Sequence, residues 1–389
     1  MVNNIRKVYL DNNATTKVDE RVIEYMNIFF RDTYAVASSQ FSHTPGIKAK
    51  DAVVKSRNII AESINAKADE IIFTSGATEA NNLAIKGVAY ADKTNRDKII
   101  ISSIEHFSVY QTAEHLRKDG YKVEYIKVDE EGFVDIEDLK TKIDEKTLLV
   151  SICIGNHEVG TIQDISSISE IVHSRGAYLH SDGAAAYLQT DIDVIKDNID
   201  LLSITAHKIY GPKGVGALFV KKNIPIVKVF GGGFQEFDLR PGTENVPGIA
   251  GFGKAVEIYS KKDSEFAYNM RNCLYKELNK NIDGVILNGA SDFSKRLCNN
   301  LNVSFEYIEG ESVVLHLDMR GIAVITGSAC FSRSLQASHI LLAMGFSHER
   351  AHGSIRFSTS KYITKDDIHY TVTEVKDVIE KLRKLSPLI

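Results

Sequence analysis

Three short segments carry side chains that could share one chemistry. TSGATEANNLAIKG starts as a strand and passes through Gly76 into a helix start, where free backbone N–H groups suit a phosphate. HSDGA places Asp182 near the carboxyl end of a predicted strand, the edge at which open α/β sheets bind ligands. In SITAHKIYGPKGVG, an apolar strand leads to His207 and Lys208 and then to a Gly/Pro-rich turn.

Each segment also has an ordinary structural interpretation. A tight strand-to-helix turn prefers Gly and Thr, a strand-end Asp often caps a helix, and most lysines are solvated charges. Taken together, the segments offer a lysine able to form a Schiff base, an acid able to pair with a pyridinium nitrogen, and a phosphate site. Pyridoxal phosphate requires these three parts of its protein, so the sequence predicts a site for that cofactor.

Cys330 lies in GSACFSR, among small and polar residues. Free cysteines are among the most buried residue types, so both a core thiol and a nucleophile on a loop stay open at this point. The four cysteines form no Cys-x-x-Cys pair, which argues against a disulfide framework and against a cysteine-rich zinc site.

The elements that must position these residues follow from the hydrophobic pattern. Between about residues 70 and 220, short β-branched runs alternate with amphipathic segments, which is typical of a largely parallel sheet covered by helices. The runs are IIFTS, KIIIS, KVEYIKV, TLLVSICI, AYLHSD, LLSITA and GALFV. From about Lys254 a long helical stretch, the strand CNNLNVSF and a charged terminal helix near Asp366 to Lys384 predict a smaller α+β domain.

Length and composition narrow the function classes. The 389 residues are enough for two or three packed domains, and a net charge of -4 lacks the basic excess that favours nucleic-acid binding. The N-terminus has no apolar signal-peptide core, and no run of 18 apolar residues occurs. We therefore expect a cytoplasmic protein that binds neither nucleic acid nor membrane directly.

The motifs are recognisable as a set. YLDNNATT, TSGATEANNLAIKG, SITAHKIYGPKGVGALFV, RPGTENVPGIAG and GSAC, in this order over nearly the whole chain, resemble the NifS/IscS-like cysteine desulfurases of the class V aminotransferase family. The resemblance implies a PLP-dependent transferase of fold type I and a homodimer with active sites near the subunit interface. Residues 15–260 would form a large domain with a mainly parallel seven-stranded sheet. Residues 1–14 and 261–389 would form a smaller α+β domain carrying the catalytic cysteine loop.

The resemblance also implies roles for individual residues. Lys208 would hold the cofactor through a Schiff base, Asp182 would pair with its ring nitrogen, and His106 would stack on its ring and shuttle protons. The implied phosphate binders are Ala77, Thr78, Thr205 and His207, with Thr243 reaching over from the partner subunit.

The implied reaction is desulfuration of L-cysteine to L-alanine. Asn156 would lie beside the cofactor hydroxyl and the substrate carboxylate, and Arg356 would clamp that carboxylate. Cys330 would take the sulfur as a persulfide and pass it to an acceptor protein, such as an iron-sulfur scaffold or a tRNA-thiolation enzyme.

Several positions depart from the family pattern. Ala185 stands where a glutamine usually bonds the cofactor hydroxyl, and His157 replaces a second asparagine. The segment starting at Val36 is altered, and the segment around Asp238 carries one insertion. These changes lie near the expected cofactor and substrate, so they put the choice of substrate in doubt. Phe331 and Arg333 replace smaller residues after Cys330, and this change bears on the choice of acceptor.

Other functions stay open beside the desulfurase. A selenocysteine lyase or another PLP-dependent C–S lyase fits the altered pocket. An aminotransferase of this fold is a second alternative, although it would not need Cys330. A third is a non-catalytic paralogue that binds a partner protein. A zinc hydrolase is the rival from another class, because HERAH, His348 to His352, matches a zinc-binding pattern. Gly353 follows at once, where a zincin helix would continue, so we predict no metal site.

Overall fold

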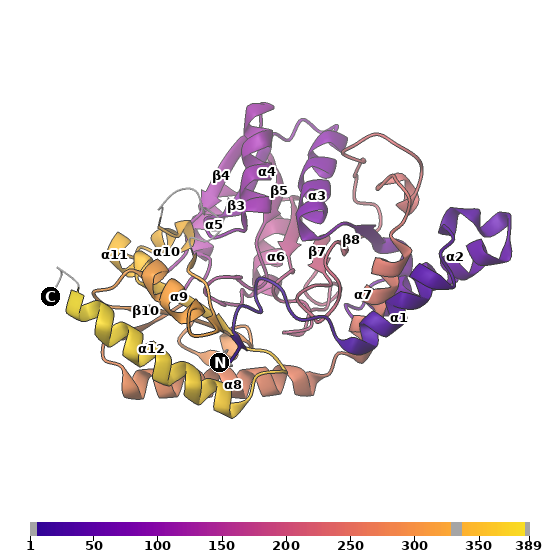
Figure 1. Cartoon of the computed structure of the whole chain (residues 1–389). Helices are drawn as coiled ribbons and strands as arrows, with labels where there is room; N and C mark the ends of the chain where they lie inside the picture. The colour runs from indigo at the N-terminus through magenta and orange to yellow at the C-terminus, as the bar shows by residue number, and fades with distance from the viewer. Residues whose placement is uncertain (1–5, 328–336, 386–389) are drawn as a thin grey trace.

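A seven-stranded sheet forms the centre of the larger part of the molecule in a computed structural model, which describes residues 6–327 and 337–385 (Figure 1). Neighbouring strands run parallel, except that β8 runs antiparallel to both of its neighbours, β2 and β7. The mainly parallel sheet expected from the sequence is therefore confirmed. Its order is β2 (Ile71–Thr74), β8 (Gly216–Val220), β7 (Leu201–Thr205), β6 (Tyr178–Asp182), β5 (Thr147–Ser151), β3 (Lys98–Ser102) and β4 (Lys122–Ile126).

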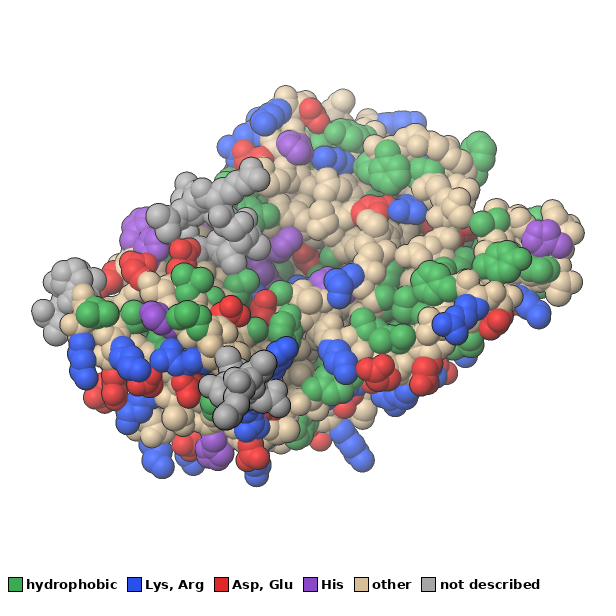
Figure 2. Space-filling model, viewed as in Figure 1, with side chains coloured by type: hydrophobic (Ala, Val, Ile, Leu, Met, Phe, Trp, Pro, Cys, Tyr) green, Lys and Arg blue, Asp and Glu red, His purple; other side chains and the backbone are tan. Residues whose placement is uncertain are grey.

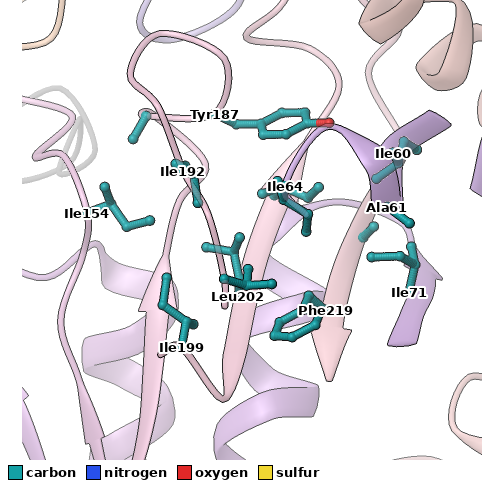
Figure 3. Packing of buried hydrophobic residues seen from close by; sticks show 14 of the residues in the cluster. Ile60, Ala61, Ile64, Ile71, Ile154, Tyr187, Ile192, Ile199, Leu202 and Phe219 are labelled. Atoms are coloured by element: carbon teal, nitrogen blue, oxygen red, sulfur yellow. The ribbon is translucent and has the colours of Figure 1, made fainter. Parts of the chain in front are cut away.

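Both faces of this sheet are buried. Along β7 and β8, Leu202 and Phe219 belong to one apolar cluster, whereas Leu201 and Leu218 belong to another. Because successive strand side chains point to opposite faces, these clusters cover the two sides of the sheet. Figure 3 shows Leu202 and Phe219 packed beneath Ile64 on the first side.

Helices cover the sheet and extend beyond it. Helices α3 (Ala77–Ala91) and α4 (Phe107–Lys118) pack together, and α7 (Val246–Ile258) contacts both α1 (Glu20–Arg31) and α2 (Thr44–Glu62). The indigo pair α1 and α2 projects to one side of the molecule in Figure 1. Shorter elements of this part are η1 (Ala37–Phe41), η2 (Ala68–Glu70), α5 (Ile136–Lys142), α6 (Ile165–Ser174) and η3 (Glu236–Asp238).

A second sheet has its own core. The antiparallel order is β12 (Ser354–Ser358), β10 (Asn300–Phe305) and β9 (Val285–Asn288). Helices α8 (Lys261–Asn281) and α12 (Lys365–Leu385) pack against each other along the lower edge in Figure 1. Val8 and Leu10 join this separate apolar cluster, since β1 (Val8–Tyr9) pairs with β11 (Ile322–Ala323). The exact domain division stays a prediction.

The remaining short elements bear on the rival zinc hypothesis. They are η4 (Phe293–Lys295), α9 (Gly310–Asp318), α10 (His339–Ala343) and α11 (His348–His352). Ser347 caps α11 by accepting the Arg350 N–H, and the helix ends before Gly353. Among the residues described, no three His, Cys, Asp or Glu side chains gather as metal ligands.

Within residues 6–327 and 337–385, no helix combines the length and the apolar character needed to cross a bilayer.

Candidate functional site

The start of α3 provides backbone donors at the carboxyl end of β2. Gly76 is the N-cap residue with φ +152°, and no side chain caps the helix there. The first N–H groups of a helix have no partner within it, so those of Ala77 and Thr78 are available to an anion. The positive end of the helix dipole adds to this preference, as the sequence predicts.

The turn after β7 faces this helix start across the same cavity. Thr205 ends β7 and is fully buried, and His207 and Lys208 follow in the turn. Burial, followed by the positive charges of Lys208 and Lys213, lowers the pKa of His207 to about 4. Its buried Nδ1 has no hydrogen-bond partner in the protein, so a neutral His207 can take part in binding a ligand here.

Asp182 ends β6 and is held from two directions. Its Oδ1 accepts the Ala184 N–H at 2.9 Å, and its Oδ2 accepts a proton from Asn81 Nδ2 at 2.8 Å. Asn81 is fully buried and donates its other amide proton to Ser108 Oγ at 2.7 Å. The Asp182 carboxylate is therefore fixed in orientation before any ligand binds.

His106 is the N-cap residue of α4 and shares the same network. Its Nδ1 accepts the Ser108 N–H at 3.1 Å and lies 2.7 Å from Ser108 Oγ. A ring nitrogen that accepts a backbone N–H carries no proton, so the neutral ring has its proton on Nε2. Burial lowers the pKa of His106, opposed by Asp182, and the ring packs edge to face on His157 at 5.1 Å.

Arg356 lies in the middle of β12, which belongs to the second sheet. Its Nη2 donates to Asp11 Oδ1 at 2.6 Å and its Nη1 donates to the His157 carbonyl at 3.1 Å. Its Nε is buried and has no partner in the protein. A planar cation with an unused donor is suited to bind a carboxylate.

One cavity of about 470 Å³ brings these groups together, and residues of the seven-stranded and the three-stranded sheet line it. Figure 2 shows histidine side chains near the middle of the visible face, between the upper and lower parts of the molecule. The predicted site residues that line the cavity are Ala77, Thr78, His106, Asp182, Thr205, His207, Lys208 and Arg356, and the departure Ala185 lines it as well.

Three other predicted residues are placed differently. Asn156 does not line the cavity, because its amide donates to the Ile104 carbonyl and its Oδ1 accepts two backbone N–H groups of its own turn. The neighbouring His157 lines the cavity instead. Thr243 is exposed and outside the cavity, and Cys330 lies outside the described residues, as do Phe331 and Arg333.

Buried acids near the cavity were not anticipated from the sequence. Burial raises the pKa of Glu105 to about 8, and its Oε1 accepts the Ser102 hydroxyl and the Cys153 N–H. Burial likewise raises the pKa of Glu158, which lines the cavity. Glu105 directly precedes His106 in the turn segment that follows the buried strand β3, and that position is the one signal that could have indicated it.

The chemistry of this donor set fits pyridoxal phosphate. The helix α3 amides and the unpartnered His207 Nδ1 suit a phosphate, and Asp182 offers an acceptor-only carboxylate to a protonated ring nitrogen. Lys208 supplies the primary amine that the cofactor aldehyde requires, and it lines the same cavity.

Several known proteins are similar to this chain over nearly its full length. Proteins named "Cysteine desulfurase IscS" are similar to this chain: one from Clostridium botulinum (strain Hall) is 45% identical over 386 residues, covering 98% of this chain and 97% of the relative. One from Dictyoglomus turgidum is 46% identical over 385 residues, with 98% and 97% covered. A solved "NifS-like protein" superposes with a TM-score of 0.90 at 36% identity, covering 97% of this chain and all of that structure.

The family model for class-V aminotransferases, which are PLP-dependent enzymes, matches residues 8–371. That range contains the seven-stranded and three-stranded sheets and every described residue that we predicted for the site. This chain belongs to the class-V aminotransferase family.

Proposed function

We propose that this protein is a PLP-dependent cysteine desulfurase that converts L-cysteine to L-alanine and holds the sulfur as a persulfide on Cys330. The observation that carries the proposal is the single cavity lined by Lys208, Asp182, His106 and Arg356. The similarity to curated cysteine desulfurases over nearly the full chain supports it. Cys330 lies outside the described residues, so its role rests on the sequence motif.

The chain's own residues divide the work of binding. Lys208 would attach the cofactor, Asp182 would pair with its ring nitrogen, and Ala77, Thr78, Thr205 and His207 would hold its phosphate. When bound, the cofactor supplies a sink for the electron pair left when the substrate Cα loses a proton. Thr243, which is exposed, would add a phosphate contact to the partner subunit's site.

Arg356 would orient the substrate by its carboxylate, leaving the Cα and the thiol towards the middle of the cavity. His157 would take the role predicted for Asn156, because His157 lines the cavity and Asn156 does not. His106, neutral and with its proton on Nε2, would donate a hydrogen bond in the resting enzyme.

The sulfur transfer is balanced without an external oxidant. The Cys330 thiolate forms a bond to the substrate sulfur while the Cβ–S bond breaks. The β carbon is reduced to the methyl group of L-alanine, gaining a proton, and the transferred sulfur is oxidised to the sulfane level. A reductant or an acceptor protein is needed only afterwards, to release the sulfur from Cys330.

The test is product formation by purified holoenzyme given L-cysteine and a reductant. Wild type is expected to form alanine and sulfide in equal amounts, and Cys330→Ala is expected to form neither above background. Cys153→Ser is the matched control, because Cys153 lines the cavity yet has no part in the proposed transfer. Lys208→Ala should lose both the visible absorbance of the bound cofactor and turnover.

The same assay separates the other enzyme classes. Alanine formed by Cys330→Ala at the wild-type rate would overturn sulfur transfer through this cysteine and favour a C–S or C–Se lyase. Transfer of the amino group to a keto acid would indicate an aminotransferase. A wild-type protein that binds cofactor but turns over neither amino acid would indicate a non-catalytic paralogue.

We further propose a homodimer. The segment formed by α1, η1 and α2 exposes large apolar side chains, with Phe41 91%, Tyr34 80% and Phe30 61% exposed. Apolar side chains gathered on a projecting segment mark an interaction surface, and a second copy of this chain would cover them. Light scattering should give a molar mass near twice 43.2 kDa, whereas a monomer would contradict the proposal.

The acceptor would be a protein that needs sulfane sulfur, such as an iron-sulfur scaffold or a tRNA-thiolation enzyme in the cytoplasm. Incubating the persulfide form with either class of acceptor and following loss of the Cys330-bound sulfur by mass spectrometry distinguishes them.

A further inference from the structure

The pairing of Arg356 with Asp11 has a consequence for how the cavity holds a carboxylate. Arg356 Nη2 and Asp11 Oδ1 are 2.6 Å apart, and their side chains are 8% and 16% exposed. Arg356 lines the cavity, but Asp11 does not. The acid therefore contacts the guanidinium from outside the cavity and leaves the cavity side of Arg356 to a ligand.

The pair is held by backbone structure on both sides. Arg356 belongs to β12, and Asp11 forms a parallel bridge with Ser358 of the same strand. The Ser358 N–H donates to the Leu10 carbonyl at 2.6 Å, which ties the residue preceding Asp11 to β12. A largely buried pair between two anchored segments keeps its geometry, unlike an exposed ion pair between mobile side chains.

An anion entering the cavity thus meets a cation whose charge is already partly compensated. Arg356 lines the cavity and can bind the anion there, but the negative charge of Asp11 weakens the attraction. In the proposed reaction, L-cysteine and L-alanine carry the same carboxylate. Tighter binding of both would lower KM without raising kcat and would slow the release of L-alanine.

We propose that Asp11 is a specificity-determining residue that moderates how strongly Arg356 holds the carboxylate of the amino acid. The inference rests on the proposed function, because it assumes that an amino acid occupies this cavity. It predicts that removing the charge of Asp11, while keeping an acceptor beside Nη2, tightens the binding of carboxylate ligands only.

The experiment compares L-alanine with ethylamine, which has the same amine and methyl group but no carboxylate. Each is titrated into the holoenzyme, and binding is followed by the absorbance of the bound cofactor. Asp11→Asn is expected to lower the Kd of L-alanine by about tenfold and to leave the Kd of ethylamine unchanged. Asp11→Ser, which also removes the charge, should shift the Kd of L-alanine in the same direction.

The control is Asp367→Asn, which breaks the 2.7 Å pair with Arg6 outside the cavity and should change neither Kd. The inference is overturned if both Asp11 variants bind L-alanine as wild type does or more weakly, or if ethylamine shifts equally. Wild-type turnover of L-cysteine is measured alongside. Its absence would overturn the proposed function, whereas normal turnover with unshifted Kd values would overturn only the inference about Asp11.

Discussion

Asn81 and Asp182, 101 residues apart in the chain, meet through a 2.8 Å hydrogen bond from Nδ2 to Oδ2. The second amide proton of Asn81 goes to Ser108 Oγ, which in turn contacts His106 Nδ1. The orientation of the Asn81 amide is unambiguous, because the carboxylate can only accept. One buried amide thus positions both an acid and a histidine of the candidate site.

Asn81→Ala should weaken retention of the cofactor. The variant removes the donor to Asp182 Oδ2, and a hydrogen bond to a charged group contributes about 1.5–3 kcal/mol, so the cofactor Kd should rise about tenfold or more. Equilibrium dialysis of the cofactor, read by absorbance, measures this. Asn82→Ala is the control, since Asn82 donates only to the Thr78 carbonyl of its own helix. An unchanged Kd in Asn81→Ala would contradict the assigned role.

Glu105→Gln should change how stability depends on pH. Burial raises the pKa of Glu105 from 4.5 to about 8, so the folded protein keeps a proton that the unfolded chain releases near pH 4.5. Between these values the folded state binds more protons, and raising the pH destabilises it. Glutamine cannot ionise, so the variant should gain stability relative to wild type as pH rises from 5 to 8, by up to about 1.4 kcal/mol per pH unit.

Urea unfolding of both proteins at pH 5, 6.5, 8 and 9 checks this. The difference in free energy of unfolding should widen up to pH 8 and then level off, because above the folded pKa both states of the wild type are ionised. A difference that is constant over the series, or that shrinks as pH rises, would show that Glu105 ionises normally in the folded protein.

Cys153 should react slowly with alkylating reagents although it lines the cavity. Burial, with Glu105 and Asp182 adding negative charge nearby, raises the pKa of its thiol well above the usual value. The thiolate is the reactive form, so iodoacetamide at pH 8 should modify Cys153 much more slowly than free cysteine. Peptide mass spectrometry over time measures the rate, and the urea-unfolded protein is the control. Labelling of native protein as fast as free cysteine would refute the prediction.

Much of this architecture was predictable from local pattern. All seven β-branched runs named from the sequence are strands of the central sheet, since their alternation with helices is a strong signal. Asp182 and Thr205 end adjacent parallel strands, so their meeting at one sheet edge follows from the topology. The sequence did not predict that His157 rather than Asn156 faces the cavity, because the turn after the strand decides which side chain does so.

Polar pairs between distant segments could not be predicted from the local sequence pattern. Nothing near Asn81 in the sequence indicates Asp182, and nothing near Asp11 indicates Arg356, because each pair forms only after distant segments pack. The protonation of Glu105 likewise depends on complete burial, which is a property of the folded core. Such contacts depend on how distant segments pack, which the motifs of a family do not encode.

Glu236→Ala should destabilise the fold strongly. The Glu236 carboxylate accepts from both terminal nitrogens of Arg57, at 2.8 and 2.6 Å, and from the Phe73 N–H at 2.7 Å, with both charged side chains buried. Removing one partner leaves the Arg57 charge buried and uncompensated, which costs about 3–5 kcal/mol. Asp191→Ala is the control: its pair with Lys261 is 91% and 85% exposed, so its loss should cost about 0–1 kcal/mol. Urea unfolding midpoints, compared at unchanged m-value, give the loss in free energy of unfolding for each variant. Equal losses in the two variants would contradict the prediction, because burial is what makes the Arg57–Glu236 pair costly to break.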